Sequence, residues 1–148
     1  MVSMTFYLNE EAREKGLTLG IPRDGDAGFD LPAFEEVEIL PKEMALIRTG
    51  VHLAIPRGWV GLVRDRSSVA AKKGGAVTAG VIDAGYRGEV KVVMHNLSND
   101  PIQFSVGDRI AQCIVIPHLE GVHAVQVSTE KELGSTERGE GGFGSTGI

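Results

Sequence analysis

The chain has a single cysteine, few aromatic residues and no long apolar run. One cysteine in 148 residues excludes an intramolecular disulfide framework. Cys113 lies in the apolar run 110–116, which predicts a core residue rather than a nucleophile or metal ligand. No run approaches the roughly 18 apolar residues of a membrane span, and residues 1–8 lack the pattern of a signal peptide. We therefore expect a cytoplasmic protein with no membrane partner.

An excess of positive charge is also missing. The chain carries 15 Lys and Arg residues against 20 Asp and Glu, a formal net charge of −5. Sequence-independent binding of nucleic acid needs a basic face, so we expect no nucleic-acid partner. His52, His95, His118 and His123 form no close pair with a cysteine or carboxylate, and each is interpreted as an ordinary surface or core residue. A small anionic ligand held by a few local cations fits this composition.

Short alternating runs dominate what is present. Apolar and polar residues alternate with the period of a half-buried strand, and turns with Pro or Gly follow at intervals of about 8 to 12 residues. The alternating runs are 2–8, 36–39, 51–55, 90–95 and 102–106. This pattern predicts one all-β domain, a sandwich or barrel, with a sizeable core.

Helical periodicity is nearly absent. The segment 69–73 is predicted to be a short helix, with Ser67 or Ser68 as its N-cap and Gly74 as its C-terminal stop. The segment 9–15 is the other candidate for a helical turn. No internal repeat or linker is found.

The segment 138–148 has five glycines, one arginine, two hydroxyl groups and one aromatic ring. Arg138 and the hydroxyl groups suit phosphate oxygens, and the ring of Phe143 can stack on a nucleobase. These glycines do not lead into a helix, unlike those of a Walker-type loop. Composition leaves two interpretations open: a disordered terminus, or a segment that becomes ordered over a ligand.

The segment 80–88 has the pattern of a β-hairpin, because two β-rich runs flank a turn with two glycines. Asp83 and Tyr86 would lie at its mouth. A carboxylate fixed at the end of a strand can hold and deprotonate a water molecule. The alternatives are that Asp83 caps the turn and that Tyr86 serves packing alone.

A second group of polar residues surrounds the start of the predicted helix 69–73. The guanidinium and hydroxyl groups of 66–68 suit an anion, or they belong to a capped helix with a solvated arginine. Asp65 would oppose a phosphate if it pointed inward. Asp30 could pair with Arg66, and Gln112 could either donate to a phosphate or face solvent.

Five segments, in this order, resemble the five motifs of the trimeric dUTPase (dUTP pyrophosphatase) family. They are AGFDL at 27–31, RSSVAAKKG at 66–74, GVIDAGYRG at 80–88, GDRIAQ at 107–112 and RGEGGFGSTG at 138–147. The resemblance implies hydrolysis of dUTP to dUMP and pyrophosphate, which keeps uracil out of DNA and supplies dUMP for dTMP synthesis. It implies a jelly-roll-like β-barrel or sandwich with one short helix, in a homotrimer that exchanges its C-terminal tails between subunits.

The same resemblance assigns roles to individual residues. Asp83 would activate the water that attacks the α-phosphorus, and Tyr86 would exclude a ribose 2′-hydroxyl. Backbone groups around 77–87 would read uracil, and Asp30 would orient the arginine or waters of a Mg²⁺ ion that arrives on the phosphates without direct protein ligands. The implied substrate contacts are Arg66, Ser67, Ser68, Val77, Gly80, Ile82, Tyr86, Gln112, Arg138, Phe143, Gly144, Ser145 and Thr146.

The implied organisation is a β domain at 1–133 followed by a mobile glycine-rich lid at 134–148. In that lid Arg138, Ser145 and Thr146 would hold the γ-phosphate while Phe143 covers uracil. Two positions depart from the family pattern: Asp65 stands where proline is frequent, and 84–85 is Ala-Gly where many members have a more polar pair.

Two related functions compete with dUTP hydrolysis. A dCTP deaminase has a similar motif at 80–88, but its general-base glutamate would fall at Val93. A phage-type regulatory protein that binds repressors commonly carries an inserted segment, and 97–105 leaves no room for one.

Overall fold

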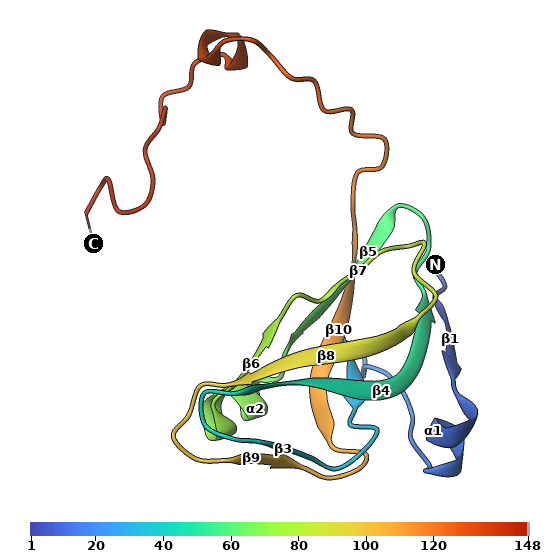
Figure 1. Ribbon diagram of the computed structural model, residues 1–148. Coiled ribbons are helices and arrows are strands. Elements are labelled where there is room, and N and C mark those ends of the chain that lie inside the picture. The colour runs from blue at the N-terminus through green and yellow to red at the C-terminus, as the bar shows by residue number, and fades with distance from the viewer. Residues whose placement is uncertain (148) are drawn as a thin grey trace.

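Two four-stranded sheets face one another in the computed structural model, which describes residues 1–147 (Figure 1). The first sheet has the order β1-β4-β8-β6, with strands Thr5–Leu8, Met44–Ala54, Glu89–Asn96 and Gly75–Thr78. The second has the order β2-β10-β5-β7, with strands Gly28–Pro32, Arg109–Pro117, Trp59–Asp65 and Val81–Ile82. A two-stranded sheet of β3 (Val37–Ile39) and β9 (Ile102–Phe104) completes the body. The predicted all-β, jelly-roll-like sandwich is confirmed.

The core lies between the two large sheets and is built by alternation. In β8 the side chains of Val90, Val92 and Met94 are fully buried, whereas the residues between them are at least partly accessible. Leu31 and Cys113 contribute to the same core from the second sheet. Burial raises the pKa of the Cys113 thiol to about 11, which keeps it neutral and confirms its prediction as a core residue.

The protein has two short α-helices, whereas the implied jelly-roll-like fold has one. Helix α1 (Glu10–Glu14) begins after Asn9, whose side chain accepts a hydrogen bond from Ala12 N at 2.9 Å, as the candidate turn at 9–15 indicated. Helix α2 (Ser67–Lys73) ends at Gly74, which has a left-handed φ of 71°, as predicted.

The N-cap prediction for α2 was wrong. The N-cap is Arg66, which has extended backbone angles and makes no side-chain capping bond, whereas Ser67 is already helical. The helix therefore starts one or two residues earlier than hydroxyl chemistry suggested, because β5 runs directly into it. As a consequence, the side chain of Arg66 projects from the junction between β5 and α2.

Two strands differ from the alternation pattern. Strand β1 forms, but Phe6 is 43% exposed and Tyr7 is 54% exposed, so in the single chain the predicted half-burial of this edge strand is limited to Leu8, which packs against the core. Strand β4 extends from Met44 to Ala54, well beyond the predicted run 51–55. Its first half was missed because the order of apolar and polar residues in 44–50 is not strictly alternating.

The hairpin prediction for 80–88 was also wrong. Strand β7 pairs with β5, with Ile82 opposite Gly61, whereas β8 belongs to the other sheet. The turn after Ile82 therefore crosses from one sheet to the other. Glycines and a polar residue suit both kinds of turn, which is why the local pattern could not distinguish them.

A long arm follows the last strand. Strand β10 ends at Pro117, and the described residues beyond it contain only turns and a short 3-10 helix η1 (Glu130–Leu133). The arm leaves the sheets and curves away from them (Figure 1). The sheets thus end before the predicted boundary at 133, and the lid at 134–148 stays a prediction, with Ile148 outside the described residues. Within 1–147 no helix has the length and apolar character to cross a membrane.

Candidate functional site

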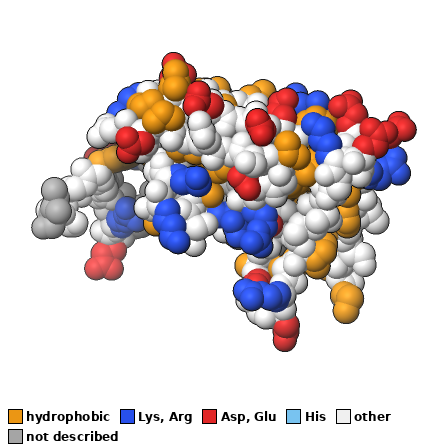
Figure 2. All heavy atoms as spheres, turned by 90° about the horizontal axis from the view of Figure 1, so that it is seen from below, with side chains coloured by type: hydrophobic (Ala, Val, Ile, Leu, Met, Phe, Trp, Pro, Cys, Tyr) orange, Lys and Arg blue, Asp and Glu red, His pale blue; other side chains and the backbone are white. Residues whose placement is uncertain are grey.

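Basic side chains gather on one face of the protein. Figure 2, which views the molecule from below, shows Lys and Arg side chains near the middle of this face. A groove of about 300 Å³ is lined by Arg66, Lys72, Lys73 and Arg109, among others. Arg66 and Arg109 also line a neighbouring pocket of about 590 Å³. An acidic chain thus has a local positive region that suits a small anion.

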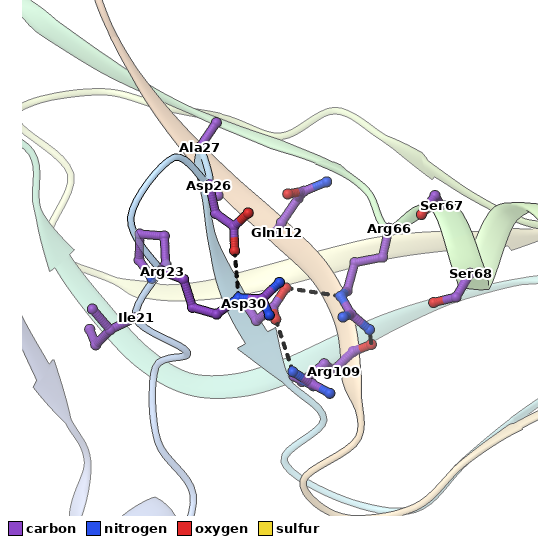
Figure 3. Close-up of a pocket in the computed structure, with 12 residues that line it drawn as sticks. Ile21, Arg23, Asp26, Ala27, Asp30, Arg66, Ser67, Ser68, Arg109 and Gln112 are labelled. Atoms are coloured by element: carbon purple, nitrogen blue, oxygen red, sulfur yellow. Dashed lines mark hydrogen bonds and ion pairs between the residues drawn. The ribbon is translucent and has the colours of Figure 1, made fainter.

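The larger pocket, which we call the arginine pocket, brings together one half of the predicted site. It lies among β2, β10 and the start of α2 (Figure 3). Four of the predicted phosphate contacts line it, together with Asp30, and these four are Arg66, Ser67, Ser68 and Gln112. Together with Asp30 they come from three segments separated in sequence, which the antiparallel pairing of β10 with both β2 and β5 places side by side.

An ion pair orders this pocket. Arg66 Nε donates to Asp30 Oδ1 at 2.9 Å, which confirms the predicted pairing. Arg109 Nη1 lies 3.5 Å from the other oxygen of Asp30, and Arg66 Nη1 donates to the carbonyl of Arg109 at 3.2 Å. Charge-assisted bonds of this kind fix the direction of a guanidinium. Arg66 therefore has a defined orientation before any ligand arrives.

Arg109 and Arg23 line the arginine pocket but were missed as site residues. Arg109 lies within GDRIAQ, so its motif gave a signal that was assigned to Gln112 alone. Arg23 pairs with Asp26 at 3.0 Å and has a side chain that is 90% exposed, and nothing in its local sequence marked it. Three arginines thus face two aspartates in this pocket, and the balance favours an anion.

Gln112 and Asp65 have fixed partners inside the protein. Gln112 Nε2 donates to the carbonyl of Asp65 at 2.9 Å, so this side chain is held at the pocket rather than free in solvent. The Asp65 carboxylate accepts from Val77 N at 2.6 Å and does not line the arginine pocket. The concern that Asp65 would oppose a phosphate therefore does not apply, because its charge is directed at the backbone of β6.

A second pocket, which we call the aspartate pocket, holds the other half of the predicted site. Its volume is about 240 Å³, and it is lined by Gly80, Ile82, Asp83 and Tyr86 together with Glu89. Tyr86 N donates to the carbonyl of Asp83 at 3.0 Å, and this backbone bond closes the turn. Within residues 1–147 the Asp83 carboxylate takes no hydrogen bond, so it does not cap the turn and is open to a ligand or water.

The ring of Tyr86 is fixed along the turn. Its hydroxyl donates to the carbonyl of Glu89 at 2.9 Å, and a Cβ at Gly88 would collide with the ring. The Glu89 carboxylate in turn accepts from Gly50 N at 2.8 Å and from Arg48 Nε at 3.0 Å. Tyr86 is thus hydrogen-bonded to the backbone of Glu89, and the Glu89 side chain is hydrogen-bonded to β4. Glu89 was another residue that the motif did not single out.

The two pockets have no lining residue in common. Val77 lines neither of them, although it is linked to Asp65. The predicted tail contacts Arg138, Phe143, Gly144, Ser145 and Thr146 also line neither pocket. One chain therefore presents two half-sites and a separate arm.

The arm has local turns of its own. Arg138 Nε donates to the carbonyl of Gly141 at 2.8 Å, and Gly142 N donates to Ser145 Oγ at 2.8 Å. Phe143 is fully exposed and has a positive φ of 51°, a conformation that costs a bulky residue energy. Its ring is free to contact a flat partner.

Known proteins resemble this chain in sequence and in fold. A family model described as dUTPase matches residues 18–147. A deoxyuridine 5′-triphosphate nucleotidohydrolase of Mycobacterium bovis is 50% identical over 129 residues, covering 84% of this chain and 83% of the relative. A protein of the same name from Cutibacterium acnes is 42% identical over 127 residues, covering 84% of this chain and 81% of the relative.

Solved structures share the fold. A mutant dUTPase of Staphylococcus bacteriophage 80alpha with dUpNHpp matches with a TM-score of 0.83 and 27% identity, covering 100% of both chains. A native dUTPase of EIAV matches with a TM-score of 0.70 and 29% identity over 86% of this chain and 98% of the other. Because the family model spans most of the sequence and close relatives cover it at up to 50% identity, the chain belongs to the dUTPase family.

Proposed function

We propose that this protein hydrolyses dUTP to dUMP and pyrophosphate, which keeps uracil out of DNA and supplies dUMP for dTMP synthesis. The observation that carries the proposal is the presence of two complementary half-sites in a member of the dUTPase family. One half has the open carboxylate of Asp83 beside Tyr86, and the other has Arg66 fixed by Asp30. The 80alpha enzyme has been solved with dUpNHpp, an analogue of the same substrate class.

The arginine pocket binds the phosphates. The guanidinium of Arg66, the hydroxyls of Ser67 and Ser68 and the amide of Gln112 are hydrogen-bond donors that line one pocket. Phosphoryl transfer depends mainly on positioning and on neutralising charge, and preorganised donors supply both. The Asp30 ion pair lowers the cost of ordering Arg66 when the triphosphate arrives.

Asp83 acts as the general base. Its carboxylate lies in an open pocket with the Tyr86 ring and takes up the proton of a water molecule as the water attacks the α-phosphorus. Such proton transfer typically contributes about 10²- to 10⁴-fold in rate. The Tyr86 ring covers the deoxyribose, so a ribose 2′-hydroxyl clashes with it, and backbone groups of 77–87 read the uracil.

The complete site forms in a homotrimer. The two half-sites share no lining residue within a chain, and the arm extends away from the body instead of covering either pocket (Figure 1). Both observations are explained if one subunit supplies the aspartate pocket, a second supplies the arginine pocket and the tail of a third closes the site. In that closed site Arg138, Ser145 and Thr146 hold the γ-phosphate and Phe143 stacks over uracil.

The metal is Mg²⁺ carried by the triphosphate. Residues 1–147 contain no group of three side chains that could hold a metal ion, whereas Mg²⁺ usually keeps waters and takes phosphate oxygens as ligands. The Asp30 carboxylate of the arginine pocket can accept a hydrogen bond from such a water. Bound Mg²⁺ would neutralise phosphate charge. A dUTPase of phage phi11 has been solved with a structural Mg(II) ion.

The competing functions find no support in the site. Val93 of β8 pairs with Leu46 and Thr78, and a valine cannot relay the protons of a deamination. The connection from β8 to β9 spans only 97–101, whereas a phi11 dUTPase structure visualises a species-specific insert. Hydrolysis of dUTP is therefore the function that the geometry favours.

A substrate panel tests the proposal. The protein is offered dUTP, dCTP, dTTP and UTP with Mg²⁺, and both pyrophosphate and ammonia are measured. Pyrophosphate from dUTP, with little from the other nucleotides, is the expected result. Ammonia released from dCTP would replace the proposal with deamination, and the absence of any turnover would leave a binding protein.

A further inference from the structure

Strand β6 is attached to β5 across the boundary between the two large sheets. β6 is an edge strand of the first sheet, and β5 belongs to the second. Val77 N donates to Asp65 Oδ1 at 2.6 Å, and Val63 N donates to the carbonyl of Gly80 at 2.7 Å. The segment 77–80 is therefore bound at both ends to the same strand.

The contact between Gly80 and β5 leaves no room for a side chain at position 80. Gly80 has a φ of 95°, and a Cβ there would lie 2.8 Å from the carbonyl oxygen of Val63. Close approach and a left-handed conformation both require glycine at this position. The other end of the segment depends on a side chain, the carboxylate of Asp65.

Asp65 itself is held in place. Its carbonyl accepts from Gln112 Nε2 at 2.9 Å, and its Cα lies opposite Ala111 in the pairing of β5 with β10. The following residue is Arg66, the N-cap of α2. Asp65 thus connects the backbone of β6 to the junction between β5 and α2, where Arg66 of the arginine pocket lies.

A carboxylate is well suited to this contact. The amide of Val77 lies on a half-buried edge strand, where an unpaired N–H would be costly. Hydrogen bonds to a charged acceptor are about twice as strong as those between neutral groups. The side chain that departs from the family pattern therefore supplies a bond that proline cannot make.

We propose that Asp65 is a positioning residue for base selection, whose carboxylate fixes the β6 backbone that reads uracil. The inference rests on the proposed function. We call the backbone of 77–80, which is proposed to read uracil, the uracil wall. Without this bond the uracil wall loses one of its two attachments to β5 and keeps only its pairing with β8 on that side, so it is held less firmly. Catalysis by Asp83 is affected less, because Asp83 follows β7, which has its own pairing with β5. In the proposed homotrimer, the arginine pocket of one subunit and the uracil wall of the same subunit belong to two different active sites. Asp65 therefore lies between two neighbouring active sites.

The test compares Asp65→Ala with Asp65→Asn. Loss of one charge-assisted hydrogen bond predicts a KM for dUTP about tenfold higher in Asp65→Ala, and a ratio of kcat/KM for dUTP over dCTP about tenfold lower. We expect kcat to change by less than about threefold. Asp65→Asn keeps a neutral acceptor oxygen at the same place and should recover most of the loss in KM and in the substrate ratio.

Glu120→Ala is the matched control. Glu120 Oε1 accepts from Gly58 N at 2.7 Å, the same kind of bond, and neither residue lines the two pockets. Its KM and substrate ratio should stay unchanged. An Asp65→Ala protein that loses thermal stability but keeps its KM and substrate ratio would overturn the proposal, because the contact would then be structural only.

A second comparison covers the case in which Asp65→Ala does not fold. Asp65→Glu keeps the charge but displaces the carboxylate by one methylene group, so it should be more strongly impaired in KM and substrate ratio than Asp65→Asn. Equal behaviour of the Glu and Asn variants would contradict the proposal. Failure of the unmodified protein to hydrolyse dUTP would refute the proposed function instead, and is read from the substrate panel.

Discussion

Asp30 and Arg66 form an ion pair at 2.9 Å that joins β2 to the start of α2, and their side chains are only 22% and 25% exposed. The same carboxylate also lies near Arg109. A partly buried pair of this kind orients a cation that would otherwise sample many rotamers. The arginine that is proposed to hold the phosphates is therefore preorganised by its neighbour.

Asp30→Ala is predicted to weaken substrate binding. Arg66 and Arg109 lose their shared partner, and kcat/KM for dUTP should fall about 10- to 100-fold, the cost of a hydrogen bond to a charged group. Steady-state kinetics checks this. Asp26→Ala is the control in the same pocket, because the Arg23–Asp26 pair is largely exposed and should contribute little. Equal losses in both variants would show that charge alone matters, not the orientation of Arg66.

Asp83→Asn is predicted to abolish most turnover and to leave binding largely intact. The change removes the proton acceptor but almost no volume, so kcat should fall by roughly 10²- to 10⁴-fold. Calorimetric titration with dUpNHpp measures the retained affinity. The exposed Asp100→Asn serves as a control outside both pockets. Near-normal turnover in Asp83→Asn would remove this residue from the mechanism.

Removal of 138–148 is predicted to reduce catalysis without unfolding the body. The described part of this segment contributes nothing to the buried core, so the melting temperature should change little. Loss of the γ-phosphate donors should lower kcat by roughly 10²-fold or more. Lys131→Ala, a change in the arm outside the predicted contacts, should be silent. A drop in melting temperature as large as that of a core mutation would contradict the lid.

Gly88→Ala is predicted to relax discrimination against UTP. The new Cβ would lie 2.8 Å from Cε2 of Tyr86, so the ring must move away from the deoxyribose position. The ratio of kcat/KM for dUTP over UTP should therefore fall several-fold. Gly85→Ala is the matched control, since its Cβ would meet no atom within 4 Å. If both variants keep the full ratio of kcat/KM for dUTP over UTP, Tyr86 does not exclude the ribose 2′-hydroxyl.

Stability is predicted to decline at alkaline pH through Cys113. Burial raises the pKa of this thiol to about 11, while an unfolded thiol titrates near about 8.5. The folded chain holds the proton more tightly, so the contribution is fully present below about pH 8.5 and is lost as pH rises towards about 11. Urea unfolding across this range measures the slope, which should be shallower in Cys113→Ala. Identical slopes would contradict this role.

Much of the site could be predicted because its residues lie in short motifs. Asp30, Arg66 and Gln112 were identified from such motifs, and the structure gathers them in one pocket. The role of Asp65 was not visible, because its partner Val77 lies in another strand and the contact depends on how two sheets approach. Arg23 was missed for the same reason, since only tertiary structure brings it to the pocket.

The fold class followed from alternation, but individual strands did not all follow from it. In β8 the period of burial matches the sequence, because both neighbours of this strand are present in the chain. In β1 the apolar Phe6 remains exposed, because alternation records that a side chain is apolar and not what will cover it. The turn after Ile82 crosses between sheets, and nothing local specifies which strand β7 joins.

The separation of the arginine pocket from the aspartate pocket has a genetic consequence. If each complete site takes one pocket from each of two subunits, an Arg66→Ala chain and an Asp83→Asn chain damage different halves. A mixed assembly of these two inactive proteins then contains some sites in which both halves are intact. Co-expression of two defective copies would restore activity by complementation, whereas either copy alone would leave the cell without it.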